Sequence, residues 1–521
     1  STDNVRFVFD KVKGDVRFGN ITNLSSLDGD FRNIDKSLTI GSITNSKGNS
    51  AIALNLDNIK KDVNLGSMQS TKLDITAKGL GKDFTVGNLD VMATATSTAT
   101  HNANISFDGV AGNIQLANVE KFNNVKFDAK NVEGTFTVGN FTNMMEKATI
   151  NFNFNHIGRL VTLGNINGNT GAKFNLTADN LAQGLTVGNV NIPESSSTDI
   201  QNGLVNIDSG RTEGTVTIGN VTVGADSTVK IDLSQSLQAN TVGTITGGNV
   251  TFKSSAISHT NGSNGVDISL ASTTGINVDP KANVTGSVGR DVFNFKFRDE
   301  GSSTFSGKTY AVGGDLGDGM DKYTLDLNVT ANNLKTIDLS ALKNAEKGTI
   351  TLGSSSIAIN NKSLNVKGTD GDDTFKVDGA LTNGTAQKPN VLTLEGGRGS
   401  DIYNIGAAAT TNADANKYVS ISNIKHGDKV KIDGATSWAK YDASDLDTKD
   451  SLKEAANEVL AHSGANVANK IWAFTYKSDT YLLQDGTGAG STIADSDHLV
   501  KLAGYHIDNL NPYFSGGELT L

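Results

Sequence analysis

The stretch GGRGSDIY, residues 396–403, matches the nonapeptide pattern G-G-x-G-x-D-x-U-x, in which U is a large apolar residue. Glycines allow a tight turn that points backbone carbonyl oxygens inward, and the aspartate adds a carboxylate. Carbonyl and carboxylate oxygens are the ligands that calcium prefers. The aromatic residue that follows returns the chain to a packed strand. The stretch therefore predicts a calcium-binding turn that leads into a strand.

Three further copies are GSVGRDVF (286–293), LGDGMDKY (316–323) and GTDGDDTF (368–375). Each departs at one glycine position, where Ser287, Leu316 or Thr369 stands instead. The aspartate and the aromatic residue are in phase in all four copies, which chance does not explain. Asp315 and Asp318 are close enough in sequence to Asp321 to share its calcium, and Asp370 and Asp372 stand similarly to Asp373. Of these four, Asp318 and Asp370 are included among the predicted ligands. The predicted ligands are Gly286, Gly289, Asp291, Gly317, Asp318, Gly319, Asp321, Gly368, Asp370, Gly371, Asp373, Gly396, Gly397, Gly399 and Asp401.

A second pattern fills the first half of the chain, in which alternating apolar and polar residues lead into Gly-Asn and another apolar residue. Its glycines recur every 21 to 31 residues, and a second alternating run lies between copies. Alternation with period two indicates half-buried strands, and a repeat in the twenties indicates a solenoid whose stacked turns share one core. The copies are VRFGNI (16–21), LTIGSI (38–43), VNLGSM (63–68), FTVGNL (84–89), FTVGNF (136–141), VTLGNI (161–166), LTVGNV (185–190), VTIGNV (216–221) and the degenerate IQLANV (114–119).

Leucine-rich repeats share this period. They need leucines at fixed offsets and a helical return, whereas here the apolar positions are Val, Ile and Phe and both halves of the repeat read as strand. We therefore predict an all-β protein, a long parallel β-solenoid, over a leucine-rich repeat. The asparagines after glycine are interpreted as a structural stack at the bends, with a sugar-binding face as the less favoured alternative.

The calcium copies fit the same repeat length, since Asp291, Asp321, Asp373 and Asp401 lie 30, 52 and 28 residues apart. The interval of 52 residues is about twice the other two and holds TITLGS (349–354), a copy without the aspartate. We predict a solenoid over residues 1–280, a calcium-binding continuation over 281–410, and a compact C-terminal domain over 411–521. This last domain should hold a helix over 449–462 and a hairpin with strands at 471–476, 480–485 and 498–502.

Composition narrows the possible functions. The chain has no cysteine, which excludes disulfides and thiolate metal sites, and its net charge of −10 argues against nucleic acid as a partner. There is no H-E-x-x-H and no G-x-S-x-G, and the seven histidines are scattered, so no catalytic site is predicted. A β-helix polysaccharide lyase or epimerase would need acids and Lys or Arg clustered on one solenoid face, and the sequence phase shows no such cluster. His426-Gly427-Asp428 is interpreted as a turn, and His498 and His506 as packed residues.

No apolar run approaches the ~20 residues that span a bilayer, and the chain enters strand-like sequence directly. We expect it to be a processed piece of a longer protein.

The nonapeptide copies are RTX repeats, and with the runs FTYKSDTYLLQD (474–485) and DHLVKLAG (497–504) the chain resembles the type I-secreted surface-layer (S-layer) proteins of Caulobacter and Campylobacter. The resemblance covers about the last 240 residues. It implies calcium-dependent self-assembly into a two-dimensional lattice on a Gram-negative cell surface. It also implies export by an ABC transporter through an uncleaved C-terminal signal, for which the tail GELTL (517–521) is suited. Family members attach to lipopolysaccharide through an N-terminal region that nothing here matches. An RTX adhesin is the alternative, although the near-identical domain-length repeats of adhesins are lacking.

Overall fold

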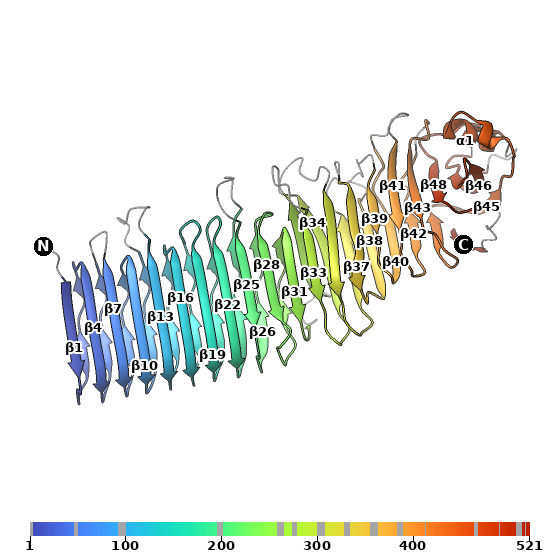
Figure 1. Cartoon of the computed structure of the whole chain (residues 1–521). Helices are drawn as coiled ribbons and strands as arrows, with labels where there is room; N and C mark the ends of the chain where they lie inside the picture. Colours follow the sequence, from blue (N-terminus) through green and yellow to red (C-terminus); the bar gives the residue numbers. More distant parts are fainter. Residues whose placement is uncertain are drawn as a thin grey trace. The chain divides into compact units, whose positions relative to one another are not determined.

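The computed structural model forms a parallel β-solenoid of about 15 turns with one short helix near the C-terminus, which confirms the predicted fold class (Figure 1). Contacts divide the chain into an N-terminal unit, Ser1–Val266, and a C-terminal unit, Asp267–Leu521, which we describe separately. No helix among the described residues is long and apolar enough to cross a membrane. The structure describes residues 4–45, 50–91, 100–194, 202–257, 265–272, 279–299, 308–327, 334–354, 363–382, 389–411, 413–462, 467–488, 490–506, 513–515 and 517–521.

Each coil of the N-terminal unit contributes one strand to each of three parallel sheets, which we name A, B and C. Sheet A holds the longest strands: β1 (Asn4–Asp10), β4 (Ser26–Ile34), β7 (Ala51–Ile59), β10 (Lys72–Leu80), β13 (Asn102–Val110), β16 (Asn124–Val132), β19 (Thr149–Ile157), β22 (Lys173–Leu181), β25 (Leu204–Ser209), β28 (Thr228–Leu233) and β31 (Asn249–Ser254).

Sheets B and C are built from shorter strands that flank the Gly-Asn bend. Sheet B holds β2 (Val16–Phe18), β5 (Leu38–Ile40), β8 (Val63–Leu65), β11 (Phe84–Val86), β14 (Ile114–Leu116), β17 (Phe136–Val138), β20 (Val161–Leu163), β23 (Gly184–Val187), β26 (Thr215–Ile218) and β29 (Thr241–Val242). Sheet C holds β3 (Ile21–Thr22), β6 (Ile43–Thr44), β9 (Met68–Gln69), β12 (Leu89–Asp90), β15 (Val119–Glu120), β18 (Phe141–Thr142), β21 (Ile166–Asn167), β24 (Val190–Ile192), β27 (Val221–Val223) and β30 (Ile245–Gly247).

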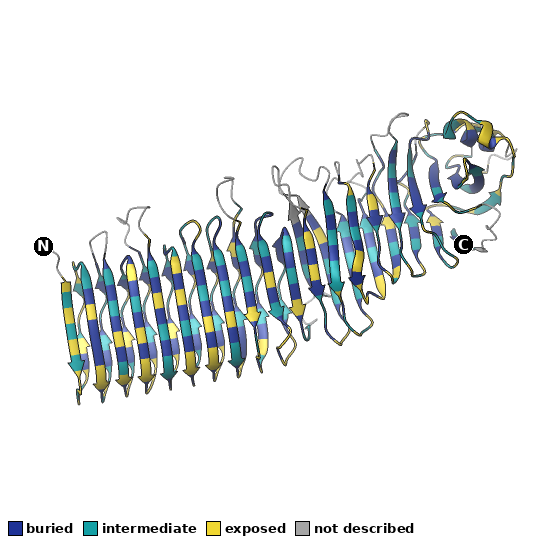
Figure 2. Ribbon diagram, viewed as in Figure 1, coloured by how far each residue is buried: buried dark blue, intermediate teal, exposed yellow. Residues whose placement is uncertain are grey.

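Buried positions alternate with more exposed ones along the strands, and the buried side chains of successive coils form the core (Figure 2). In β13, Ala103, Ile105 and Phe107 are buried, whereas the residues between them face outward. Phe152 lies between Phe127 and Phe174 of the neighbouring coils, with ring centroids 5.0 and 6.1 Å away. No coil buries its apolar face alone, so the stack is stabilised by burial between coils.

The asparagine stack at the Gly-Asn bend is confirmed as a structural feature. The side-chain Oδ1 of Asn140 accepts the backbone N–H of Asn165 at 2.9 Å, and Asn165 accepts that of Asn189 at 2.8 Å. Each asparagine thus satisfies a backbone donor of the next coil that lies outside the short strands.

The C-terminal unit has two strands per coil, which form two parallel sheets that we name D and E. Sheet D holds β33 (Lys281–Thr285), β35 (Thr309–Asp315), β37 (Thr336–Lys343), β39 (Asn365–Lys367), β41 (Asn390–Glu395) and β43 (Lys417–Ser422). Sheet E holds β34 (Val292–Asp299), β36 (Lys322–Leu327), β38 (Lys347–Leu352), β40 (Asp372–Val377), β42 (Ile402–Ile405) and β44 (Lys429–Ile432). Strand β32 (Val266–Ser272) spans the division between the units.

The last hundred residues pack a helix and an antiparallel sheet against the end of these coils. Helix α1 (Leu452–His462) follows η1 (Leu446–Thr448) and lies within the predicted range of 449–462. The predicted hairpin is confirmed as β46 (Lys470–Tyr476), β47 (Asp479–Gln484) and β48 (His498–Ala503), and β45 (Ser437–Lys440) pairs with β46. Strand β48 pairs with β43 of sheet D, and β50 (Glu518–Thr520), paired with β49 (Tyr513–Ser515), lies antiparallel to β44 of sheet E.

Candidate functional site: the aspartate ladder

Five aspartates of the C-terminal unit lie where the chain passes from a sheet D strand to the following sheet E strand. Each is at most 1% exposed, and each directly precedes its sheet E strand except Asp373, which is the second residue of β40. Isolated buried carboxylates are costly, so their partners decide what the site does. We name this set, Asp291, Asp321, Asp373, Asp401 and Asp428, the aspartate ladder.

Hydrogen bonds link the ladder from one bend to the next. The backbone N–H of Asp291 donates to Asp321 Oδ1 at 2.7 Å. The N–H of Asp373 donates to Asp401 Oδ1, and the N–H of Asp401 donates to Asp428 Oδ1, both at 3.0 Å. One oxygen of each accepting carboxylate therefore fixes the stacking of two bends that are 27 to 30 residues apart.

The glycines of the bends are required because successive bends stack backbone on backbone. A Cβ on Gly397, where φ is +102°, would lie 1.7 Å from the carbonyl oxygen of Thr369 in the preceding bend. A Cβ on Gly317, where φ is +96°, would likewise lie 1.9 Å from the carbonyl oxygen of Ser287. Carbonyl oxygens thus line the space between bends, beside the ladder carboxylates. The other predicted glycines for which an added Cβ would lie within 3 Å of a carbonyl oxygen are Gly286, Gly319, Gly368, Gly371 and Gly399, whereas a Cβ on Gly396 would lie 2.0 Å from Asp401 Oδ2.

Two of the departures from the nonapeptide pattern have a structural reason. The hydroxyl of Ser287 donates to Asp291 Oδ1 at 3.0 Å and accepts the N–H of Gly289 at 3.1 Å. Thr369 does the same for Asp373 and the N–H of Gly371. At both positions a hydroxyl replaces glycine and holds the carboxylate of its own bend.

In the hydrogen-bonded pairs Asp291–Asp321 and Asp373–Asp401, the second carboxylate accepts fewer hydrogen bonds than the first. Asp321 Oδ2 is buried and has no hydrogen-bond partner among the described residues. Burial raises the pKa of Asp321, and burial raises the pKa of Asp373 to about 6 and that of Asp401 to about 7. A buried carboxylate whose ionisation is this unfavourable needs a neighbouring positive charge or a proton.

These residues fit a calcium ion. The carboxylates of Asp321 and Asp401, together with the carbonyl oxygens between stacked bends, form the hard oxygen environment that calcium prefers. No three His, Asp or Glu side chains within the described ranges are grouped so that they could hold a metal. Carbonyl oxygens of the Gly-rich bends would therefore supply most ligands, and calcium would neutralise the buried charge.

The structure places the other predicted carboxylates outside the ladder. Asp315, Asp318, Asp370 and Asp372 are all exposed. Asp315 Oδ1 accepts the N–H of Gly317 at 3.0 Å, and Asp372 Oδ1 accepts that of Ser400 at 2.9 Å. They therefore stabilise the outer side of the bends, whereas the ladder carboxylates face inward.

The coil between the two pairs lacks a ladder aspartate. Its predicted copy TITLGS lies in strand β38, with Gly353 after the strand instead of before it. Gly348 of this coil leaves room for the ring of Tyr323, since a Cβ there would lie 2.2 Å from Tyr323 Cζ. The Tyr323 hydroxyl donates across it to Asp373 Oδ1 at 2.7 Å. A tyrosine thus connects the two halves of the ladder where the aspartate is missing.

Asp428 was missed by the sequence reasoning. The sequence predicts only a turn at His426-Gly427-Asp428, and the stretch lacks the preceding glycines of the nonapeptide. Its Oδ2 accepts the N–H of Lys425 at 2.8 Å, which closes a tighter bend. Its position 27 residues after Asp401, directly before the alternating strand β44, is the signal that could have identified it.

The expected packing of the C-terminal histidines is half confirmed. His498 is buried, with Nδ1 3.1 Å from the carbonyl oxygen of Ala409, whereas His506 is exposed, so the prediction that it packs is wrong.

The ladder predicts an unusual dependence of stability on pH. In chelator, we expect the unfolding midpoint of the C-terminal unit to rise as pH falls from 8 to 5. The folded-state pKa values of Asp401 and Asp373, about 7 and about 6, lie above the value of 3.8 for an unperturbed aspartate, so the folded protein binds protons more tightly. The destabilisation is complete above pH 7 and is relieved as pH falls through these values. Fluorescence of Trp438 and Trp472, both in this unit, reports the transition. An Asp373→Asn/Asp401→Asn variant should lack the rise, and an unchanged slope in it would contradict the assignment.

No protein-family model matches the chain, and no curated protein is detectably related to it.

Proposed function

We propose that this chain is a calcium-stabilised structural protein of the bacterial cell surface, a subunit of a self-assembling S-layer lattice. The observation that carries the proposal is the ladder of buried aspartates in stacked, glycine-lined bends, where burial raises the pKa of Asp321, Asp373 and Asp401. Such carboxylates destabilise the fold unless calcium neutralises them, so the C-terminal unit becomes rigid only where calcium is abundant. Calcium is abundant outside the cell, and weak sites of about 10⁻⁴–10⁻³ M are typical of extracellular modules.

The solenoid also suits a lattice. Coils stack about 4.8 Å apart within each unit, so each unit offers the same outer faces repeatedly along its stacking direction. The proposal that a second copy of this chain is the main partner rests on this stacked architecture together with the resemblance of the RTX copies.

The proposal predicts calcium-dependent assembly. In chelator the purified protein should be monomeric, and millimolar calcium should convert it into ordered two-dimensional arrays, because neutralised bends fix one conformation and calcium also bridges acidic surfaces of a chain of charge −10. Light scattering and electron microscopy across a calcium titration measure this. Magnesium at the same concentration is the control, since its octahedral preference does not suit these bends. A protein that stays monomeric at millimolar calcium, while binding the ion, would favour the adhesin alternative.

Export by a type I ABC transporter is the second part of the proposal. In the folded protein β50 is paired with β44, and the N–H of Gly427 donates to the carbonyl of Leu521 at 2.7 Å, so the tail belongs to the fold. An export signal here must be read before folding. Deleting it from this chain would also remove strands that cover the ladder coils. We therefore expect residues 461–521, fused to a slowly folding reporter, to direct export by a type I transporter. A fusion that stays inside cells that export a known substrate would refute the assignment.

A further inference from the structure

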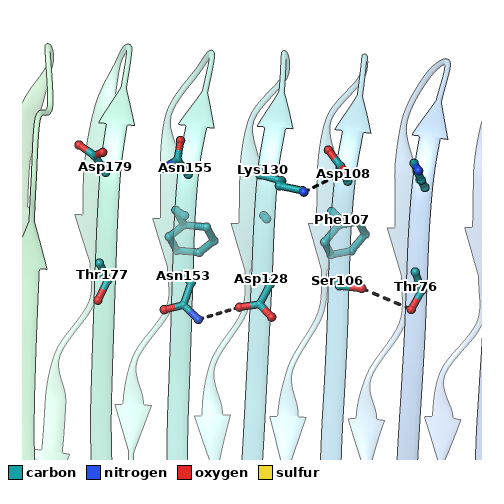
Figure 3. A pocket seen from close by; sticks show the side chains of 13 residues that line it. Thr76, Ser106, Phe107, Asp108, Asp128, Lys130, Asn153, Asn155, Thr177 and Asp179 are labelled. Carbon is teal, nitrogen blue, oxygen red and sulfur yellow. Dashed lines mark hydrogen bonds and ion pairs between the residues drawn. The ribbon is translucent and has the colours of Figure 1, made fainter.

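A groove of about 730 Å³ lies on the outer face of sheet A in the N-terminal unit (Figure 3). It crosses the neighbouring strands β10, β13, β16, β19 and β22, and its volume is in the range of ligand sites. With strands about 4.8 Å apart, five strands give a length of roughly 19 Å. The groove therefore runs along the direction in which coils stack.

Two parallel rows of side chains form its walls, with one residue from each strand in each row (Figure 3). Between them lies the backbone of Phe107, Ala129 and Phe154, whose side chains are buried in the core. Just beyond the second row, left-handed residues such as Gly109 and Asn131 turn each strand away. The first row is Thr76, Ser106, Asp128, Asn153 and Thr177, and the second is Lys78, Asp108, Lys130, Asn155 and Asp179.

The walls combine many hydrogen-bonding groups with little net charge. They carry three hydroxyls, two amides, three carboxylates and two ammonium groups, which sum to a charge of −1. Opposite charges neighbour one another, since Lys130 Nζ lies 3.2 Å from Asp108 Oδ2. Three carboxylates repel a polyanion, and an apolar peptide would leave these polar groups unpaired. A ligand rich in hydroxyls, which both donate and accept, matches the walls.

We propose that this groove binds a linear, uncharged polysaccharide that lies along the solenoid axis. The extended shape of the groove selects a polymer over a single sugar, and each coil offers one residue on either side of it.

Asp108 of the groove does not suit acid catalysis. Asp108 lies in the groove wall, and the side-chain hydrogen bond from Asn131 lowers the pKa of this carboxyl. An aspartate held ionised in this way is a poor proton donor for cleavage of a glycosidic bond. A polysaccharide lyase or epimerase needs acids and Lys or Arg clustered on one solenoid face, and the sequence phase predicts no such cluster. The structure does bring three aspartates and two lysines together on this face, where Lys130 pairs with Asp108.

Binding is tested with the full chain and soluble polymers. The probes are hydroxyethyl cellulose and dextran as uncharged polymers and polygalacturonate as the charged one, in affinity electrophoresis followed by calorimetry with the matching oligosaccharides. The groove variant is Asn153→Ala/Asn155→Ala. The matched control is Asn151→Ala/Asn175→Ala, which changes the same sheet face one row outside the groove and removes the bond of 2.9 Å between those two residues.

We expect an uncharged polymer to bind, the groove variant to bind about tenfold more weakly, and the control to bind like the unchanged protein. Polymer binding should persist in chelator, since the N-terminal unit holds none of the ladder aspartates. A failure of polymer binding is therefore distinguishable from a failure of the calcium proposal. Absence of binding to both uncharged polymers, tighter binding of polygalacturonate, or equal weakening in both variants would overturn the inference.

Discussion

In 10 mM calcium, we expect the C-terminal unit to be more stable than in chelator by roughly 5 kcal/mol. Each of the two sites, at Asp321 and at Asp401, has an expected dissociation constant of about 10⁻⁴ M and adds about 2.7 kcal/mol when calcium is present at about 100 times that constant. Urea unfolding followed by tryptophan fluorescence measures the difference, because both tryptophans lie in this unit.

The same experiment assigns the effect to a single carboxylate. Asp401→Asn should remove about 2–3 kcal/mol of the calcium-dependent part. In chelator it should leave the unit as stable or more stable, because the amide oxygen still accepts the N–H of Asp373 and the buried charge is gone. Asp378→Asn, an exposed carboxylate of the same unit, is the control and should change neither value. A loss of stability from Asp401→Asn that is equal with and without calcium would make the ladder purely structural.

The second large effect concerns the glycine of a bend. Gly397→Ala should destabilise the C-terminal unit by about 2–5 kcal/mol. A left-handed residue with a side chain costs about 1–2 kcal/mol, and forcing bends apart by a clash costs about 1–3 kcal/mol more. The new Cβ would lie 1.7 Å from the carbonyl oxygen of Thr369, so the two bends cannot stay stacked. Calcium binding measured by calorimetry should weaken together with stability.

Gly504→Ala separates the cost of the left-handed backbone conformation from the cost of the clash between bends. Gly504 also has a positive φ, of +72°, but a Cβ there meets nothing within 4 Å. This variant should therefore lose only about 1–2 kcal/mol and keep its calcium affinity. Equal losses in both variants would show that backbone conformation alone, and not the stacking of bends, makes Gly397 necessary.

Local pattern was enough to predict the elements. Alternation over a few residues decides which side chains of β13 enter the core, since neighbouring residues of a strand face opposite sides whatever lies around them. For the same reason the phase of Asp401 and Tyr403 predicted a bend followed by a strand, and both residues are buried as expected. The helix and the hairpin near the C-terminus likewise follow from residues close in sequence.

Only the tertiary structure decided which residues of neighbouring coils pair with one another. Asp401 meets the N–H of Asp373, and Tyr323 reaches Asp373 across a whole coil, because the register between coils depends on loop lengths that no local pattern encodes. Asp428 joins the ladder without the glycines that mark the others. The groove on sheet A exists only once five coils stack, since each contributes a single residue to each wall. The sequence by itself thus determined the strands, the bends and the residue types at them, whereas stacking determined which carboxylates are buried, which are satisfied, and which faces form a site.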